Sequence, residues 1–299
     1  MLVLFGGTGF IGRHICEAAT QFGLPTTVIV RSKSQELIDL YPKINFVKTG
    51  TPDEVDIMIN SQTIVYLANS SKPATPQERL THEVDVNAST LIRFSEHLFS
   101  RNPDAHLIYL SSGGQIYGPG HSEPISEENQ VDAVTPYALG KVLIEQTLNY
   151  LHDQIAAKIT ILRLSNPIGR WQLNTSHGLV TAAINAAVND QGLTIFGEGL
   201  NQRDYFDVDD FAEFIIKTAR EQNPVTGTYN IGSGRSLNEN QIIELVENVL
   251  DRRIHRTHVT GRSFDLPYAV LDIGKAQQKL GWNPKTDVEE SILKIANYV

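Results

Sequence analysis

The sequence has few of the residues that cross-link a protein or anchor it in a membrane. Its 299 residues include a single cysteine, Cys16, which excludes a disulfide framework and a cysteine-based zinc site within one chain. No apolar run approaches the roughly 18 residues of a membrane-spanning helix, so no membrane span is predicted. Met1–Phe5 runs directly into glycines and leaves no room for a secretory signal. We therefore expect a cytoplasmic protein.

Basic residues are also scarce relative to acidic ones. Lys and Arg number 25 against 34 Asp and Glu, a net charge of −9. General binding of nucleic acid or anionic membranes needs the opposite balance, and neither partner is predicted. The 41% of hydrophobic residues and 20% of charged residues exclude a disordered chain and suffice for a large core.

The first half of the chain alternates short apolar runs with helical patterns. Strands are predicted at Leu2–Phe5, Thr26–Val30, Thr63–Ala68, Leu107–Leu110 and Lys158–Leu164, and helices at Gly12–Phe22, Val86–Phe99 and Pro136–Leu151. This alternation is typical of a parallel sheet covered on both faces. We expect an α/β fold whose doubly wound parallel Rossmann sheet occupies residues 1–165.

Residues 166–299 are less regular. We interpret them as a smaller C-terminal α/β substrate-binding domain, with part of residues 203–233 returning to the first domain. Helices are predicted there at Gly178–Val188, Asp210–Arg220, Asn238–Leu250 and Val288–Tyr298. Two polar loops, Ser70–Gln77 and Pro119–Thr135, are either solvated connections or the rim of a site.

A glycine loop, Gly6–Gly12, lies between the first strand and the first helix. Gly6 permits a tight turn, Gly9 lets the backbone approach a pyrophosphate, and Gly12 allows close packing of the helix on the strand. The helix N-terminus would then offer free N–H groups to the phosphates. This context favours a dinucleotide site over a purely structural turn.

The residue after the second strand bears on the choice of cofactor. An acidic residue at this position would bind the ribose hydroxyls of NAD, whereas an arginine suits the 2′-phosphate of NADP. The sequence has Arg31 here, followed by Lys33. NADP is therefore favoured over NAD, although both side chains could simply solvate a loop.

Tyr137 and Lys141 are four residues apart on one predicted helix, which Thr135 would cap, so their side chains share a face. A tyrosine with the usual pKa of about 10 is a poor base at neutral pH. A lysine ammonium, together with an oxidised nicotinamide, would lower that pKa. Tyr137 could then take a proton from an alcohol while hydride leaves the same carbon.

Taken together, these motifs resemble those of extended short-chain dehydrogenases/reductases of the NAD-dependent epimerase/dehydratase family. The resemblance runs nearly end to end, and the run Asn166–Gly169 is similar to that of UDP-galactose 4-epimerases. Further matching motifs are Tyr66–Ala68, Glu145, Leu162–Ser165, Phe196–Gly199, Arg203–Tyr205, Val208–Asp210, Tyr229–Gly234 and Leu280–Trp282.

The resemblance implies two sets of binding residues and a homodimer formed through residues 86–99 and 136–151. Asn166, Arg203 and Arg262 would contact the diphosphate or nucleotide of a UDP- or dTDP-sugar, with Asp265 near the ribose. The cofactor would be held by Gly6, Thr8, Gly9, Phe10, Ile11, Gly12, Arg31, Leu67, Ala68, Asn87, Ser111, Tyr137 and Lys141.

One position departs from the family pattern. Where the family places a catalytic Ser or Thr, this sequence has Gly113. Ser112, one place earlier, is the alternative catalytic candidate, and a water molecule is another. The same run lacks the adjacent Asp and Glu of sugar 4,6-dehydratases, so dehydration is not predicted.

The resulting hypothesis is a nucleotide-sugar C4 epimerase that works by transient hydride transfer to a bound nicotinamide. Tyr137 would move the proton of the 4-hydroxyl, and Lys141 would tune the tyrosine. An NADPH-dependent reductase of 4-keto nucleotide sugars is the alternative. A non-catalytic NADP-binding regulator is disfavoured because the Tyr/Lys pair is intact.

No metal site is predicted. Asp207, Asp209 and Asp210 form the strongest acidic cluster, and we interpret them as capping the next helix, because carboxylates are stabilised at helix N-termini.

Overall fold

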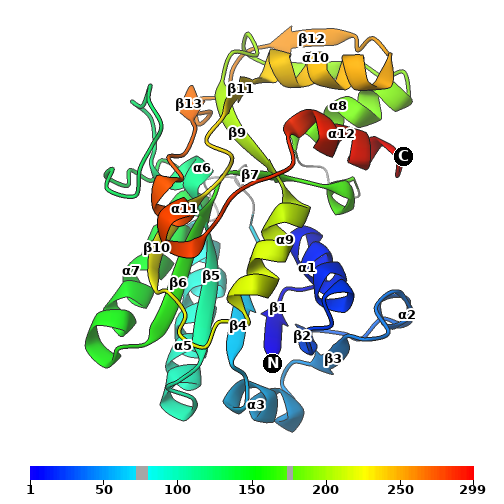
Figure 1. The fold of residues 1–299 in the computed structure, drawn as a ribbon. Helices are drawn as coiled ribbons and strands as arrows, with labels where there is room; N and C mark the ends of the chain where they lie inside the picture. Colours follow the sequence, from blue (N-terminus) through cyan, green and yellow to red (C-terminus); the bar gives the residue numbers. More distant parts are fainter. Residues whose placement is uncertain (72–79, 174–177) are drawn as a thin grey trace.

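The computed structural model describes residues 1–71, 80–173 and 178–299. Its centre is a seven-stranded parallel sheet with the strand order β10–β6–β5–β4–β1–β2–β3 (Figure 1). The strand order reverses between β1 and β4, and open α/β sheets bind ligands at the carboxyl ends of the strands beside such a reversal. The strands are β1 (Leu2–Phe5), β2 (Thr26–Val30), β3 (Asn45–Lys48), β4 (Thr63–Tyr66), β5 (His106–Ser112), β6 (Lys158–Leu164) and β10 (Gly227–Ile231).

Helices cover both faces of this sheet, because successive side chains of each strand point to opposite sides. Leu2 and Leu4 of β1 join one buried apolar cluster, while Val3 joins the other. The first face is covered by α1 (Phe10–Gln21), α2 (Gln35–Leu40), α9 (Val208–Thr218) and α11 (Gly274–Leu280). The second face is covered by α3 (Pro52–Ile59), α5 (Ser89–Arg101) and α7 (Pro136–Ile155).

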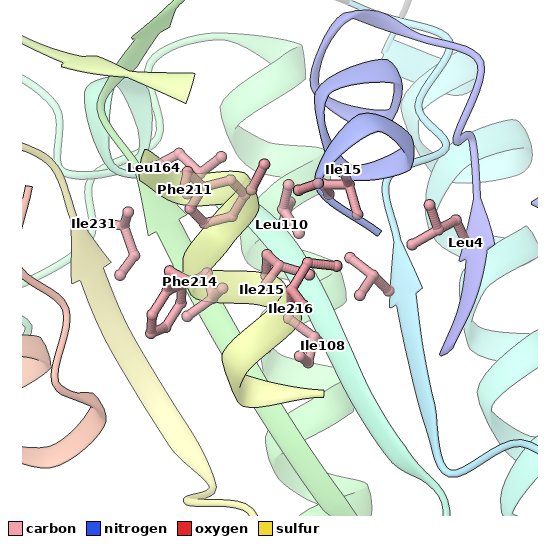
Figure 2. Close-up of a cluster of buried hydrophobic side chains, with 14 of the residues drawn as sticks. Leu4, Ile15, Ile108, Leu110, Leu164, Phe211, Phe214, Ile215, Ile216 and Ile231 are labelled. Carbon is pink, nitrogen blue, oxygen red and sulfur yellow. The ribbon is translucent and has the colours of Figure 1, made fainter. Parts of the chain in front are cut away.

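Two elements from the C-terminal half complete the large sheet. β10 pairs with β6 at one edge, and α9 packs across the strands between that edge and α1. Figure 2 shows Phe211, Phe214, Ile215 and Ile216 of α9 among side chains of several strands. The dinucleotide-type sheet is therefore not built from the N-terminal residues alone.

The remaining C-terminal elements form a smaller layer, at the top of Figure 1. One sheet has β9 (Gln202–Asp207) paired with β7 (Asn166–Ile168), β11 (Ser236–Asn238) and β13 (Tyr268–Ala269). A second contains β8 (Leu193–Phe196) and β12 (Arg256–Val259). Around a third apolar cluster pack α8 (Leu179–Val188), α10 (Glu239–Leu250) and α12 (Val288–Ala296).

The shorter helical segments of the described chain are α4 (Leu80–His82), the π-helical η2 (Glu83–Ala88), α6 (Gly113–Ile116) and the 3₁₀ turn η3 (Arg170–Gln172). Among the described helices, none has the length and apolar character to cross a membrane.

Candidate active site

The glycine loop leaves β1 and enters α1 in the geometry that its spacing predicts. Gly6 has a φ of +81°, and a Cβ added to it would lie 2.7 Å from the main-chain nitrogen of Ala68. A Cβ on Gly12 would lie 2.4 Å from the Cα of Gly7, so only glycine permits this close packing. Gly9 is the N-cap of α1, and no side chain caps the helix. The free N–H groups of the first turn suit an anionic phosphate.

A cavity of about 690 Å³ runs from this loop, past the carboxyl ends of the central strands, to the C-terminal layer. It brings together most of the residues that the sequence predicted for the site. The predicted residues on its wall are Gly6, Gly9, Phe10, Ile11, Gly12, Leu67, Ser111, Ser112, Tyr137, Lys141, Asn166, Arg203, Arg262 and Asp265.

Four predicted cofactor residues, Thr8, Arg31, Ala68 and Asn87, do not lie on this wall. Ala68 backs Gly6, and Arg31 is exposed beyond the end of β2. Asn87 contacts a residue of the wall: its Nδ2 donates to Ser71 Oγ at 3.1 Å, and Ser71 lines the cavity.

Of the two polar loops that the sequence suggested as the rim of a site, Ser70–Gln77 reaches the cavity through Ser71. Its residues 72–77 lie outside the described ranges. No residue of Pro119–Thr135 lines the cavity.

Tyr137 and Lys141 lie together at the middle of the cavity on the first two turns of α7. The predicted cap is present, since Thr135 Oγ1 accepts a hydrogen bond from the nitrogen of Ala138 at 3.2 Å. Lys141 Nζ donates to the Leu110 carbonyl at 3.0 Å and lies 5.6 Å from the centre of the Tyr137 ring. The two side chains therefore share one face, as the spacing predicts.

Burial dominates the electrostatics of this pair. It raises the pKa of Tyr137 to about 12, partly opposed by a hydrogen bond from Ser112. It lowers the pKa of Lys141 to about 8, against the attraction of the Glu83 and Glu145 carboxylates. We expected a lowered tyrosine pKa, and in the chain by itself the shift has the opposite sign. A phenolate at Tyr137 would require further positive charge in the cavity.

The structure explains the glycine at position 113. A Cβ on Gly113 would lie 2.6 Å from Leu271 Cδ1, and Gly113 is absent from the cavity wall. Ser112 lines the cavity and bonds to Tyr137. Of the two positions, only Ser112 therefore has a side chain on the cavity wall.

The far end of the cavity is lined by arginines and carboxylates. Arg262 forms two hydrogen bonds of 2.8 Å with Asp265, and its guanidinium lies 4.3 Å from the ring centre of Phe196. Arg203 is half-buried, and its Nη1 donates to the carbonyls of Gln202 and Leu266. Guanidinium groups held in this way suit phosphate oxygens.

The sequence motifs did not reveal two polar side chains of the wall, Gln115 and Glu239. Burial raises the pKa of Glu239, opposed by Arg203 and Arg262. No motif marks either residue, because Gln115 lies in a one-turn helix and Glu239 begins α10.

The wall also carries buried polar atoms that lack a hydrogen-bond partner. They are Ser111 Oγ, Gln115 Oε1, Ser165 Oγ and Glu239 Oε2. Unpaired buried polar atoms are costly, so a ligand group that reached one of them would be bound favourably. The uncapped N-terminus of α1 at one end of the cavity and Arg203 and Arg262 at the other both suit phosphate groups.

The acidic cluster after β9 is structural. Asp207 caps α9 by accepting from the nitrogen of Asp209 at 2.7 Å, as predicted. Asp209 bonds instead to the buried His14 at 2.6 Å, and Asp210 accepts from the nitrogen of Lys285 at 2.7 Å. These bonds hold α9 against α1 and the C-terminal segment.

Comparisons with known proteins agree with this geometry. The profile of the NAD dependent epimerase/dehydratase family matches residues 2–232. A dTDP-4-dehydro-6-deoxyglucose reductase of Escherichia coli is 26% identical over 98% of this chain and 96% of its own length. A UDP-glucose 4-epimerase of Thermotoga maritima, solved with UDP-glucose, is 26% identical with a TM-score of 0.85, covering 99% and 97% of the two chains. The Thermus thermophilus UDP-glucose 4-epimerase, solved with NAD, is similar in fold, with a TM-score of 0.85, 22% identity and coverage of 99% and 98%.

Proposed function

The chain belongs to the NAD dependent epimerase/dehydratase family, and from that premise we propose that it is a nucleotide-sugar 4-epimerase acting on a UDP-sugar. One observation carries the proposal: Tyr137, Lys141 and Ser112 lie on the same cavity wall as the glycine loop and the arginines. The UDP-glucose in the Thermotoga maritima enzyme supports uridine over thymidine.

The two ends of the cavity suit different ligands. The free N–H groups of α1 would hold the pyrophosphate of the cofactor, and Arg203 and Arg262 the diphosphate of the sugar nucleotide. When bound, the nicotinamide supplies a reversible hydride acceptor.

Tyr137 would move the proton in this reaction. Its Oη takes the proton of the sugar 4-hydroxyl and returns it after the sugar has turned in the cavity. Ser112 donates to the tyrosine oxygen and so stabilises its charged form. Lys141, fixed by the Leu110 carbonyl, adds positive charge beside the ring.

We propose NADP as the cofactor, on the basis of the residues that follow β2. Ile29 of β2 pairs with Phe5 of β1, so Arg31 follows β2 at the level of the glycine loop. Residues 31–34 include no acidic side chain that would repel a 2′-phosphate. The NAD in the Thermus thermophilus structure supports the alternative, NAD.

A single measurement tests both reaction and cofactor. The purified protein is denatured, and the released nucleotide is identified and counted by mass spectrometry. About one NADP per chain would support an epimerase that recycles its cofactor, whereas NAD at that ratio would replace only the cofactor assignment.

The reaction itself is tested with UDP-glucose, UDP-N-acetylglucosamine and UDP-glucuronate, following C4 epimers by chromatography. Interconversion without net change in the cofactor is expected. Consumption of NADPH by a 4-keto nucleotide sugar would instead establish the reductase, which the Escherichia coli relative favours. Binding of nucleotide sugars without any turnover would indicate a regulator.

We also propose a homodimer formed through α5 and α7. Leu139, Leu143 and Tyr150 are exposed along α7, and α7 packs beside α5 and η2, where Val86 is exposed. Exposed apolar side chains on adjacent helices are typical of a subunit interface. Sedimentation of the wild type and of Leu143→Glu tests this, with a monomeric wild type as the contradicting result.

A further inference from the structure

The guanidinium of Arg262 packs over two aromatic rings at the far end of the cavity. Its Cζ lies 4.3 Å from the ring centre of Phe196 and 5.1 Å from the ring centre of Phe264. Both distances are within the roughly 6 Å at which a cation is attracted to the face of an aromatic ring. All three residues line the cavity. Phe264 belongs to none of the sequence motifs, and the proposed reaction gives it no role.

Phe264 reaches the arginine because both residues lie in one tight turn. The nitrogen of Asp265 donates to the Arg262 carbonyl at 3.1 Å, which closes a turn of four residues beyond β12. Within this turn the Arg262 side chain bonds to the Asp265 carboxylate and packs over the Phe264 ring. The φ of Phe264 is not positive, so the backbone of the turn accepts other side chains at this position.

The charges at this end of the cavity balance one another. Arg203 and Arg262 share the wall with the carboxylates of Glu239 and Asp265. A diphosphate therefore meets no excess of positive charge, and its binding depends on donors that already point toward it. Arg262 donates to Asp265 through Nε and Nη2, and among the residues that the structure describes none accepts from Nη1. The orientation of the guanidinium thus decides where its remaining N–H groups point.

We propose that Phe264 positions Arg262 for the diphosphate of the nucleotide sugar. The inference rests on the proposed function, in which Arg262 binds that group. Together with Phe196, the Phe264 ring restricts the guanidinium before the substrate arrives, so that less conformational freedom is lost on binding. Phe264 is therefore a positioning residue that acts on substrate binding, while the chemical step proceeds without it.

The test removes the ring in the presence and in the absence of the arginine. Calorimetry gives the Kd of UDP for the wild type, Phe264→Leu, Arg262→Ala and the double variant, and UDP-glucose gives KM and kcat. We expect Phe264→Leu to raise Kd and KM by about 2–5-fold, the size of an exposed cation–π contact, and to leave kcat within about 1.5-fold of the wild type. In the Arg262→Ala background the same change should have no effect, because the ring then has no guanidinium to hold.

Phe264→Tyr and Phe22→Leu are the matched controls. The tyrosine keeps an aromatic face and should bind UDP as the wild type does. Phe22 is exposed at the C-terminal end of α1 and off the cavity wall, so its replacement should change neither Kd nor KM. An effect of Phe264→Leu that persists without Arg262 would show that the ring contacts the nucleotide itself and would overturn the positioning role. An unchanged Kd, or a tyrosine variant that binds as weakly as the leucine variant, would overturn it too.

Failure of the proposed function gives a different result. The Kd of UDP tests Phe264 even if the wild type converts no UDP-glucose, and that outcome would overturn the epimerase alone. A wild type that binds no UDP would overturn both.

Discussion

Arg163 and Glu145 form a buried ion pair that joins β6 to α7, the helix that carries Tyr137. Arg163 Nη2 donates to Glu145 Oε2 at 2.7 Å, and Nε donates to the same carboxylate at 3.1 Å. Glu145 follows Tyr137 and Lys141 at steps of four along α7, so the pair fixes the face on which both lie. The remaining donor, Nη1, bonds to Tyr117 Oη at 2.8 Å.

Removing one partner of this pair should be strongly destabilising. Glu145→Gln would leave the Arg163 charge buried and uncompensated, at a cost of about 3–5 kcal/mol in the free energy of unfolding. Urea unfolding measures it, with Asp104→Asn as the control. Asp104 forms an exposed pair with Lys158, and its loss should cost no more than about 1 kcal/mol. If Glu145→Gln lowered the free energy of unfolding as little as Asp104→Asn, the buried ion pair would not have the stabilising role assigned to it.

Tyr137→Phe should abolish turnover while leaving the cofactor bound. The change removes the hydroxyl that would transfer the proton, and such a group is typically worth about 10²–10⁴ in rate. It leaves the glycine loop, where the cofactor's pyrophosphate would bind, unchanged. Initial rates and the cofactor content of the purified variant are the measurements. Near-wild-type rates would exclude Tyr137 as the proton carrier, and loss of cofactor would indicate a positional role.

Lys141 should titrate near pH 8 in the cofactor-free protein, because its pKa is lowered to about 8 by burial. Glu83→Gln should lower it further, since the neutral amide no longer favours the ammonium. The ¹³C signals of dimethylated lysines, assigned with Lys141→Met, follow both titrations. A titration near the usual pKa of about 10.5 would contradict the burial argument.

The same shift predicts how stability depends on pH. The folded chain binds this proton less tightly than the unfolded chain, so the unfavourable contribution of Lys141 is complete below pH 8. It fades as the pH rises to about 10.5, the usual lysine pKa. Relative to Lys141→Met, the wild type should therefore gain stability across this interval. Parallel unfolding curves at pH 7 and pH 10 test the sign.

Gly113→Ser should not restore a catalytic serine. The added side chain would press on Leu271, and such overpacking costs about 1–3 kcal/mol. We expect lower thermal stability with no gain in kcat/KM. Gly114→Ala is the matched control, because its Cβ meets nothing within 4 Å and stability should be preserved. A faster Gly113→Ser enzyme would show that position 113 faces the substrate.

Arg262→Ala should weaken substrate binding more than it slows the chemistry. Loss of a guanidinium that binds phosphate in both ground and transition states raises KM, by about 10-fold here, and leaves kcat nearly unchanged. Arg235→Ala, at an exposed position off the cavity wall, is the control. A selective fall in kcat would instead place Arg262 near the reacting carbon.

Local sequence patterns predict most strands and helices of the large sheet. Where each element begins and ends depends on contacts with other parts of the chain. The first helix was predicted from Gly12, whereas α1 begins at Phe10 because Gly9 is an extended N-cap. β3 (Asn45–Lys48) was missed because exposed polar residues flank its two buried ones at the sheet edge. The paired strands of the C-terminal layer were missed because each is short and its partner is distant in sequence.

Some residues of the candidate site can be predicted from the sequence, and others cannot. The glycine loop and the Tyr137/Lys141 pair follow from spacing along one element, and the structure places both on one cavity wall. Gln115 and Glu239 reach that wall only through tertiary packing. Spacing also carries no information on burial, which raises the pKa of Tyr137 to about 12 in the chain by itself.

The return of α9 and β10 to the large sheet has a consequence for synthesis on the ribosome. The edge strand beside β6 and the helix covering its neighbours are translated after residue 207. The nucleotide-binding core therefore cannot close while only the first 165 residues have emerged. It must wait until Leu280 of α11 has left the exit tunnel, by which time β7, β8, β9, β11, β12 and β13 of the C-terminal layer have also been made.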